Sequence, residues 1–172
     1  MKKILLFVAV AAVIVSTVNC STYECEISLP GESWVENTNR IPKFEKEFHV
    51  KASAESAAVF PAAAGLLVED VSAFGGSTEN VVADLKKSFM RSSIYKGASI
   101  RCAGEKELGG VKWTVMELAF TVRDVVMHQD FYLTKKGNQV FTVLYSATGD
   151  DNYRQYLPDF IAMVTKAKFT GK

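Results

Sequence analysis

Four strand-like segments follow one another almost without interruption, and they constrain the fold more than any other feature of this 172-residue chain. The segments cover 100–108, 111–123, 126–134 and 139–146. Short turn signals separate them, namely Gly109-Gly110, Asp124-Val125 and Lys136-Gly137-Asn138. Because tight turns join antiparallel neighbours, the sequence predicts an antiparallel meander.

The apolar positions of this meander predict burial on both faces of the sheet. In 111–123 they begin as Val111, Trp113 and Val115 and then change parity to Met116, Leu118, Phe120 and Val122. This change indicates either a β-bulge or two-sided burial. Since 139–146 is apolar on both sides as well, the sheet needs a layer above and a layer below. We therefore predict an α+β fold in which an antiparallel sheet is flanked by helices on both faces, an α/β/α sandwich.

Two helices are expected to supply these layers. Ser77 is a natural N-cap for a helix over 78–92, whose apolar residues share one face. A second helix follows Gly149-Asp150-Asp151 and extends to about Lys166. Pro158 leaves two alternatives, a helix that begins near Leu157 or an earlier turn that is kinked there. Further strands are expected over 23–29, around Phe48 and over 66–71, and the Ala-rich stretch 52–65 is expected to be an irregular connection.

The first nineteen residues are typical of a secretory signal peptide. Lys2 and Lys3 precede twelve apolar residues at 4–15, and smaller, more polar residues follow. A membrane span needs about 20 apolar residues, so this run is too short for one. We predict a signal peptide over 1–19 and a single mature domain over 20–172. Cleavage removes two of the 20 basic residues and leaves 18 against 19 acidic ones, so no nucleic-acid partner is expected.

Cys20 is placed to become the lipidated residue of a bacterial lipoprotein. Thr17-Val18-Asn19-Cys20 is similar to a lipobox, although Thr17 and Asn19 depart from its usual residues. Lipidation would anchor the protein to the periplasmic side of a membrane, and Ser21 is compatible with transfer to the outer membrane. The alternative is ordinary cleavage near Cys20, which yields a soluble periplasmic or secreted protein.

Cys25 and Cys102 are the other two cysteines, and export changes what they predict. In an oxidising compartment two thiols favour a single disulfide, so we expect a Cys25–Cys102 bridge. The alternative is two unpaired cysteines that are buried apart.

Polar residues that could perform chemistry have simpler structural explanations. His128 and Asp130 lie on one side of a strand, where they are expected to be a solvated or hydrogen-bonded surface pair and not metal ligands. His49 stands among alternating charges typical of an exposed sheet edge. Asp150-Asp151 is expected to cap a helix, and Gly75-Gly76 is expected to form the turn that precedes one. Trp34 and Trp113 are expected in the core. We therefore predict no catalytic residue, no metal site and no cofactor.

The order of elements resembles the Mog1/PsbP-like family over roughly 25–169. The resemblance is carried by Leu29 to Trp34, by 89–95 before the strand at Ile100, and by 106–113, 132–138, 142–146 and 153–169. It implies an antiparallel sheet flanked by helices and a function that is largely non-enzymatic. With the export signal, it predicts a cell-envelope protein that acts as an interaction or assembly module for another envelope protein. The alternative is a periplasmic or secreted carrier or sensor that binds a small molecule or a metal.

Overall fold

The computed structural model describes residues 23–29, 31–38, 43–51, 61–122 and 124–171. The signal-peptide prediction and Cys20 lie outside these residues. The strands are β1 (Tyr23–Glu26), β2 (Trp34–Glu36), β3 (Lys46–Val50), β4 (Ala62–Asp70), β5 (Ser99–Leu108), β6 (Val111–Val122), β7 (Val125–Lys136), β8 (Gln139–Thr148) and β9 (Lys168–Gly171). The helices are α1 (Thr78–Arg91) and α2 (Gly149–Thr165), with short 3₁₀ helices η2 (Val71–Phe74) and η3 (Ser93–Tyr95) on either side of α1.

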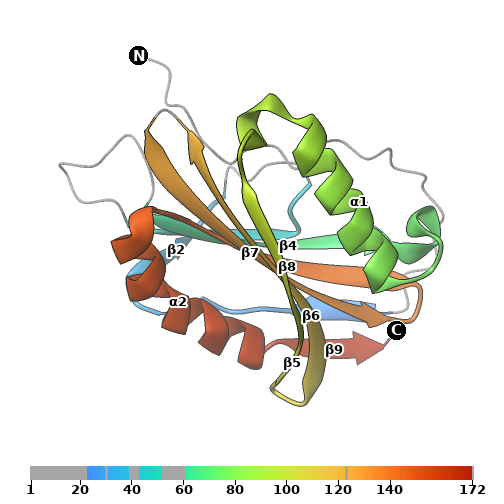
Figure 1. Ribbon diagram of the computed structural model, residues 1–172. Coiled ribbons are helices and arrows are strands. Elements are labelled where there is room, and N and C mark those ends of the chain that lie inside the picture. The colour runs from blue at the N-terminus through green and yellow to red at the C-terminus, as the bar shows by residue number, and fades with distance from the viewer. Residues whose placement is uncertain (1–22, 30, 39–42, 52–60, 123, 172) are drawn as a thin grey trace.

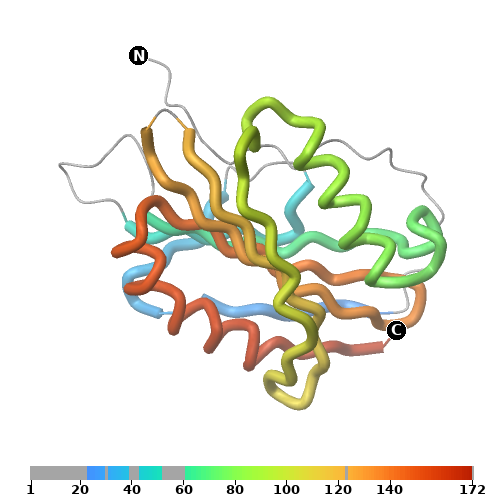
Figure 2. The backbone as a smooth tube through the Cα atoms, in the orientation of Figure 1, coloured from blue at the N-terminus to red at the C-terminus, as the bar shows by residue number. Residues whose placement is uncertain are grey.

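Seven of the strands form one twisted antiparallel sheet in the order β2-β3-β4-β8-β7-β6-β5 (Figure 1). β1 and β9 form a separate two-stranded antiparallel sheet that brings the two ends of the described chain side by side (Figure 2). The predicted meander is confirmed as β5-β6-β7-β8. The mixed α+β class with a large antiparallel sheet is confirmed as well.

The parity change in β6 comes from burial on both faces of the strand. Trp113 and Val115 belong to one hydrophobic cluster, whereas Met116, Leu118 and Phe120 belong to a second. The strand itself keeps its alternation, so it buries one face in its first half and the other face in its second half. The irregularity lies in its partner β5, where the register shifts between Cys102 and Gly104.

The two clusters draw on alternate residues of the central strands. Tyr132, Phe141, Val143 and Tyr145 belong to the first cluster, and Phe131, Leu133, Val140 and Leu144 belong to the second. α2 adds Phe160, Met163 and Val164 to the first cluster, and α1 adds Val81, Val82 and Phe89 to the second. Each helix thus contributes the apolar stripe that its sequence predicts.

The predicted irregular connection over 52–65 is wrong for its last residues, because β4 begins at Ala62 and its first six residues are buried. Residues 52–60 lie outside the described chain. The ring of Phe44 lies directly over Gly65, where it occupies the place a Cβ would take. Small residues are therefore needed here, although alanine and glycine rarely signal a strand.

The structure also decides between the alternatives for the second helix. α2 begins at Gly149 and continues through Pro158, so a start near Leu157 is wrong. Asp150 and Asp151 lie in its first turn, where the helix dipole favours negative charge. The predicted N-cap of the first helix is confirmed, since Ser77 Oγ accepts a hydrogen bond from the Asn80 amide at 3.2 Å.

Candidate functional site

A row of polar side chains crosses the sheet from its β5 edge towards its centre. Arg101, Glu117, Asp130 and Tyr145 stand on β5, β6, β7 and β8, each in register with the next. Arg101 forms an ion pair with Glu117 at the exposed end of the row. Asp130 lies deeper and is only 3% exposed, and its Oδ2 accepts a hydrogen bond of 2.8 Å from the Tyr153 hydroxyl on α2.

Burial changes the acidity of Asp130. Loss of solvation raises the pKa of its carboxyl group to about 6, and the neighbouring Glu117 adds to the rise, while the Tyr153 hydrogen bond opposes it. Desolvation and the nearby Asp130 also raise the pKa of the Tyr153 hydroxyl. Asp130 can therefore hold a proton near pH 6 in a site that the α2 helix covers.

His128 lies beside this carboxylate. Its Nε2 is 2.7 Å from Asp150 Oδ1, and its ring stacks on Tyr153 with centroids 4.5 Å apart. The prediction of a surface pair is thus wrong for Asp130, which is buried because α2 packs over it, although both side chains are hydrogen-bonded. Within the described residues, no group of three or more potential metal ligands comes together.

The environment predicted for His49 is also wrong. Its strand, β3, lies between β2 and β4 and is not an edge, and the neighbouring Glu47 is buried. Charge alternation suggested an exposed edge, but the three-residue strand β2 covers that side. The two tryptophans are in the core as predicted, and Trp34 Nε1 donates a hydrogen bond of 3.0 Å to Asp159 on α2.

The two described cysteines lie in different sheets. Cys25 is half-buried in β1, Cys102 is exposed in β5, and the structure shows no disulfide between them. Burial raises the pKa of the Cys25 thiol to about 12, so this sulfur is protonated at neutral pH. The Cys25–Cys102 disulfide and the lipidation of Cys20 stay predictions.

A groove of about 490 Å³ separates the β1–β9 sheet from the large sheet. Leu66, Val68 and Phe141 line it from the large sheet, and Tyr23 and Cys25 line it from β1. Glu45 and Lys46 contribute charged groups. The sequence offered no signal for this groove, because its lining comes from segments far apart in the chain.

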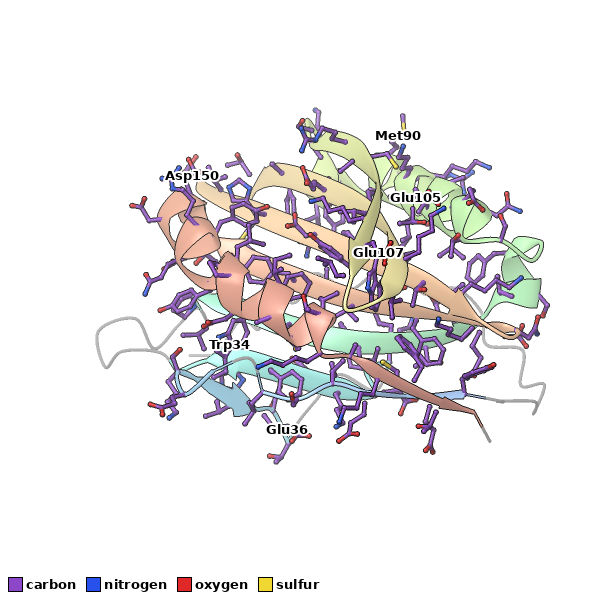
Figure 3. All side chains as sticks on the ribbon, turned by 90° about the horizontal axis from the view of Figure 1, so that it is seen from below. Trp34, Glu36, Met90, Glu105, Glu107 and Asp150 are labelled. Carbon is purple, nitrogen blue, oxygen red and sulfur yellow. The ribbon has the colours of Figure 1, made fainter. Side chains whose placement is uncertain are left out.

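One end of the molecule exposes apolar side chains, which we call the far-end patch: Met90, Ile94, Val125 and Val126. Met90 projects from the last turn of α1 and is 80% exposed (Figure 3). The other three are between 40% and 45% exposed. Sequence reasoning missed the patch, although Met90 lies off the apolar stripe of α1 and the two valines directly follow the turn at Asp124.

Aromatic contacts bring the two parts of the patch to the same end. Tyr95 in η3 packs on Phe120 of β6 with ring centroids 4.6 Å apart. Phe120 is the register partner of Met127, which immediately follows Val126. The end of α1 and the β6–β7 hairpin accordingly both lie at the top of Figure 1.

No family model matches the sequence, and no curated protein matches it in sequence. Comparison of structures does find relatives in fold. LpqN of Mycobacterium tuberculosis, a protein involved in cell envelope biogenesis, aligns with a TM-score of 0.56 at 11% identity, over 88% of this chain and 87% of LpqN. The cyanobacterial PsbP of Synechocystis sp. PCC 6803 aligns with a TM-score of 0.53 at 11% identity, over 90% and 96% of the two chains.

A structure from Bacteroides thetaiotaomicron aligns with a TM-score of 0.52 at 10% identity, over 84% of this chain and 47% of that one. At these identities the likeness concerns the fold alone. The chain has the PsbP/Mog1-like fold that its sequence resembles.

Proposed function

We propose that this protein is a non-enzymatic component of the cell envelope, a lipoprotein anchored through Cys20 that acts as a protein-interaction or assembly module in the periplasm or at the outer membrane. The observation that carries the proposal is the far-end patch. Its four exposed apolar side chains stand at one end of the domain, and exposed apolar patches mark sites of interaction. The signal peptide predicted over 1–19 supports export. LpqN, which has the same fold, is involved in cell envelope biogenesis.

The proposal treats the domain as a rigid scaffold. The two hydrophobic clusters use alternate residues of β7 and β8, which supports a placement of α1 and α2 on opposite faces of the large sheet. Tyr95 of η3 packs on Phe120 of β6, which joins η3 to this scaffold. A partner would thus meet a preformed surface, and little ordering cost would oppose binding.

The test removes the apolar surface without disturbing the core. Met90→Asp and Val126→Asp place a charge on two exposed positions of the patch, and Leu29→Asp makes the same change at an exposed leucine elsewhere. The wild type and the Leu29 variant should recover the same stoichiometric partner from envelope extracts. Each patch variant should reduce recovery about tenfold, the effect of losing one strong contact residue. Failure to recover a stoichiometric partner, or equal recovery by the patch variants, would contradict the proposal.

A second function is favoured by the groove beneath β1. A periplasmic or secreted carrier or sensor would hold a small molecule or a metal there, against the apolar residues Leu66, Val68 and Phe141.

Native mass spectrometry of the exported protein tests this alternative. A carrier should show a bound mass that disappears when Val68→Trp fills the groove and persists when Val126→Trp changes an exposed position. The bare polypeptide mass alone would exclude a bound small molecule or metal.

A further inference from the structure

Pro158 divides α2 into two parts that are attached to the domain in different ways. Pro158 has no backbone N–H to donate to the Arg154 carbonyl four residues earlier, so one helical hydrogen bond is missing at this point. The buried side chains of the helix all follow it, namely Phe160, Met163 and Val164. The apolar side chains before it are only partly buried, namely Tyr153, Tyr156 and Leu157. Core packing therefore fixes the second part of α2 more firmly than the first.

Polar contacts with the sheet hold the first part of α2. The Tyr153 hydroxyl donates a hydrogen bond of 2.8 Å to Asp130, and the Tyr145 hydroxyl of β8 donates one of 3.1 Å to the Tyr153 carbonyl. In the first turn of the helix (Figure 3), Asp150 Oδ1 lies 2.7 Å from His128 Nε2, and the His128 ring stacks on Tyr153. These contacts depend on Asp130 and His128, which are side chains that can gain or lose a proton.

The groups around Asp130 determine what its proton does. Glu117 faces Asp130 from β6 and pairs with Arg101 and Lys106 of β5. The other titratable groups that face it from β7, β8 and α2 are His128, Tyr132, Tyr145 and Tyr153. Burial raises the pKa of each of these three tyrosine hydroxyls, so they stay neutral and can donate hydrogen bonds. The remaining charged side chains of 149–159 have other partners, Asp151 with Arg154 and Asp159 with Trp34.

Protonation favours the closed arrangement, in which the first part of α2 lies on the sheet. A neutral Asp130 carboxyl group costs less to keep out of water than a carboxylate does beside Glu117. A protonated His128 would in addition form an ion pair with Asp150. Because the closed arrangement binds the Asp130 proton more tightly than an open one in water, low pH favours closure and rising pH favours opening.

We propose that residues 149–157 form an acid-closed latch, which lies on the sheet while Asp130 is protonated and opens about Pro158 when Asp130 ionises. Opening returns the Asp130 carboxylate to water and uncovers Tyr145, so the surface of the domain beside β7 and β8 changes with pH. The latch depends neither on the lipidation of Cys20 nor on the far-end patch, so it goes beyond the proposed function.

Hydrogen exchange of the mature protein tests the latch. Amide protection is taken relative to the exchange rate of an unstructured chain at each pH, and 153–157 is compared with 161–165. From pH 5 to pH 7 the protection of 153–157 should fall about tenfold, because the pKa of Asp130 is about 6 when the latch is closed and near its ordinary value when it is open.

Dilute urea separates opening of the latch from unfolding of the whole domain. Opening exposes little surface, so the protection of 153–157 should be lower than that of 161–165 and should not change in dilute urea, whereas that of 161–165 should fall. Constant protection of 153–157 between pH 5 and pH 7 would overturn the proposal. Equal protection of both parts with the same urea dependence would also overturn it.

Variants of the carboxyl group and of its hydrogen-bond donor identify the titrating group. In Asp130→Asn the protection of 153–157 should change less than about threefold between pH 5 and pH 7, the residue being the weaker His128 ion pair. Asp151→Asn, the matched control, should keep the tenfold fall. Tyr153→Phe removes the hydrogen bond that lowers the pKa of Asp130, so its fall should occur at a higher pH. A tenfold fall in Asp130→Asn, or an unshifted fall in Tyr153→Phe, would contradict the latch.

Pro158→Ala tests the hinge. Alanine supplies the N–H that can donate to the Arg154 carbonyl and thus couples the two parts of the helix. At pH 7 the protection of 153–157 should rise towards that of 161–165. An unchanged ratio between the two would show that α2 does not open about Pro158.

Discussion

At the scale of single residues, Asp130 stands out because its ionisable carboxyl group is buried. Its sequence neighbourhood predicted an exposed strand position, because alternation places His128 and Asp130 on one side of the sheet. Alternation cannot tell which side α2 covers. The position of Tyr153, 23 residues further along the chain, decides that the carboxyl group is buried.

The raised pKa of Asp130 predicts a specific pH dependence of stability. Because the folded protein binds the Asp130 proton more tightly than the unfolded chain, this group stabilises the fold below pH 4, and that stability is lost as the pH rises through about 6. Asp130→Asn removes the titration and can still accept the Tyr153 hydrogen bond. Between pH 4 and pH 7, the free energy of unfolding of the variant should therefore rise by about 2 kcal/mol relative to that of the wild type.

Urea unfolding of both proteins across this pH range measures the difference. Asp151→Asn removes an exposed carboxylate nearby and serves as the control for the loss of one charge. If the difference in the free energy of unfolding between wild type and Asp130→Asn does not vary with pH, the pKa of Asp130 is the same in the folded and the unfolded protein.

At the scale of elements, the sequence predicted those parts whose pattern is local. The meander was predictable because apolar periodicity and turn residues agree over β5 to β8, and α1 because Ser77 precedes an amphipathic stretch. The first half of β4 was not predictable, since Gly65 is required by the distant ring of Phe44. The start of α2 was ambiguous, because proline is unfavourable inside a helix. In the structure the helix continues through Pro158, and Phe160, Met163 and Val164 beyond it pack in the core.

The N-cap of α1 can be tested by comparison with a second serine. Ser77→Ala removes the hydrogen bond to the Asn80 amide and should lower the free energy of unfolding by about 1 kcal/mol. Ser92 precedes η3 but makes no such side-chain bond, so Ser92→Ala should cost less than about half as much. Equal losses in urea unfolding would indicate that the Ser77 bond does not stabilise the helix.

At the scale of the whole molecule, the fold brings exposed apolar side chains from α1, η3 and the β6–β7 hairpin to one end of the domain. The sequence predicted export, the fold family and the absence of a reaction centre. It could not predict the far-end patch, because tertiary contacts such as that between Tyr95 and Phe120 bring the end of α1 and the β6–β7 hairpin to the same end of the domain. The sequence could not predict the groove beneath β1 either, since the groove depends on the pairing of β1 with β9.

The central claim is that this domain works in the envelope as a lipid-anchored protein. Intact mass spectrometry of the mature protein from the membrane fraction tests it most directly. We predict a chain that begins at Cys20 and carries the added mass of acyl groups at that residue, and that loses both the added mass and its membrane association in Cys20→Ala. A mature protein with the mass of the unmodified polypeptide would contradict the claim.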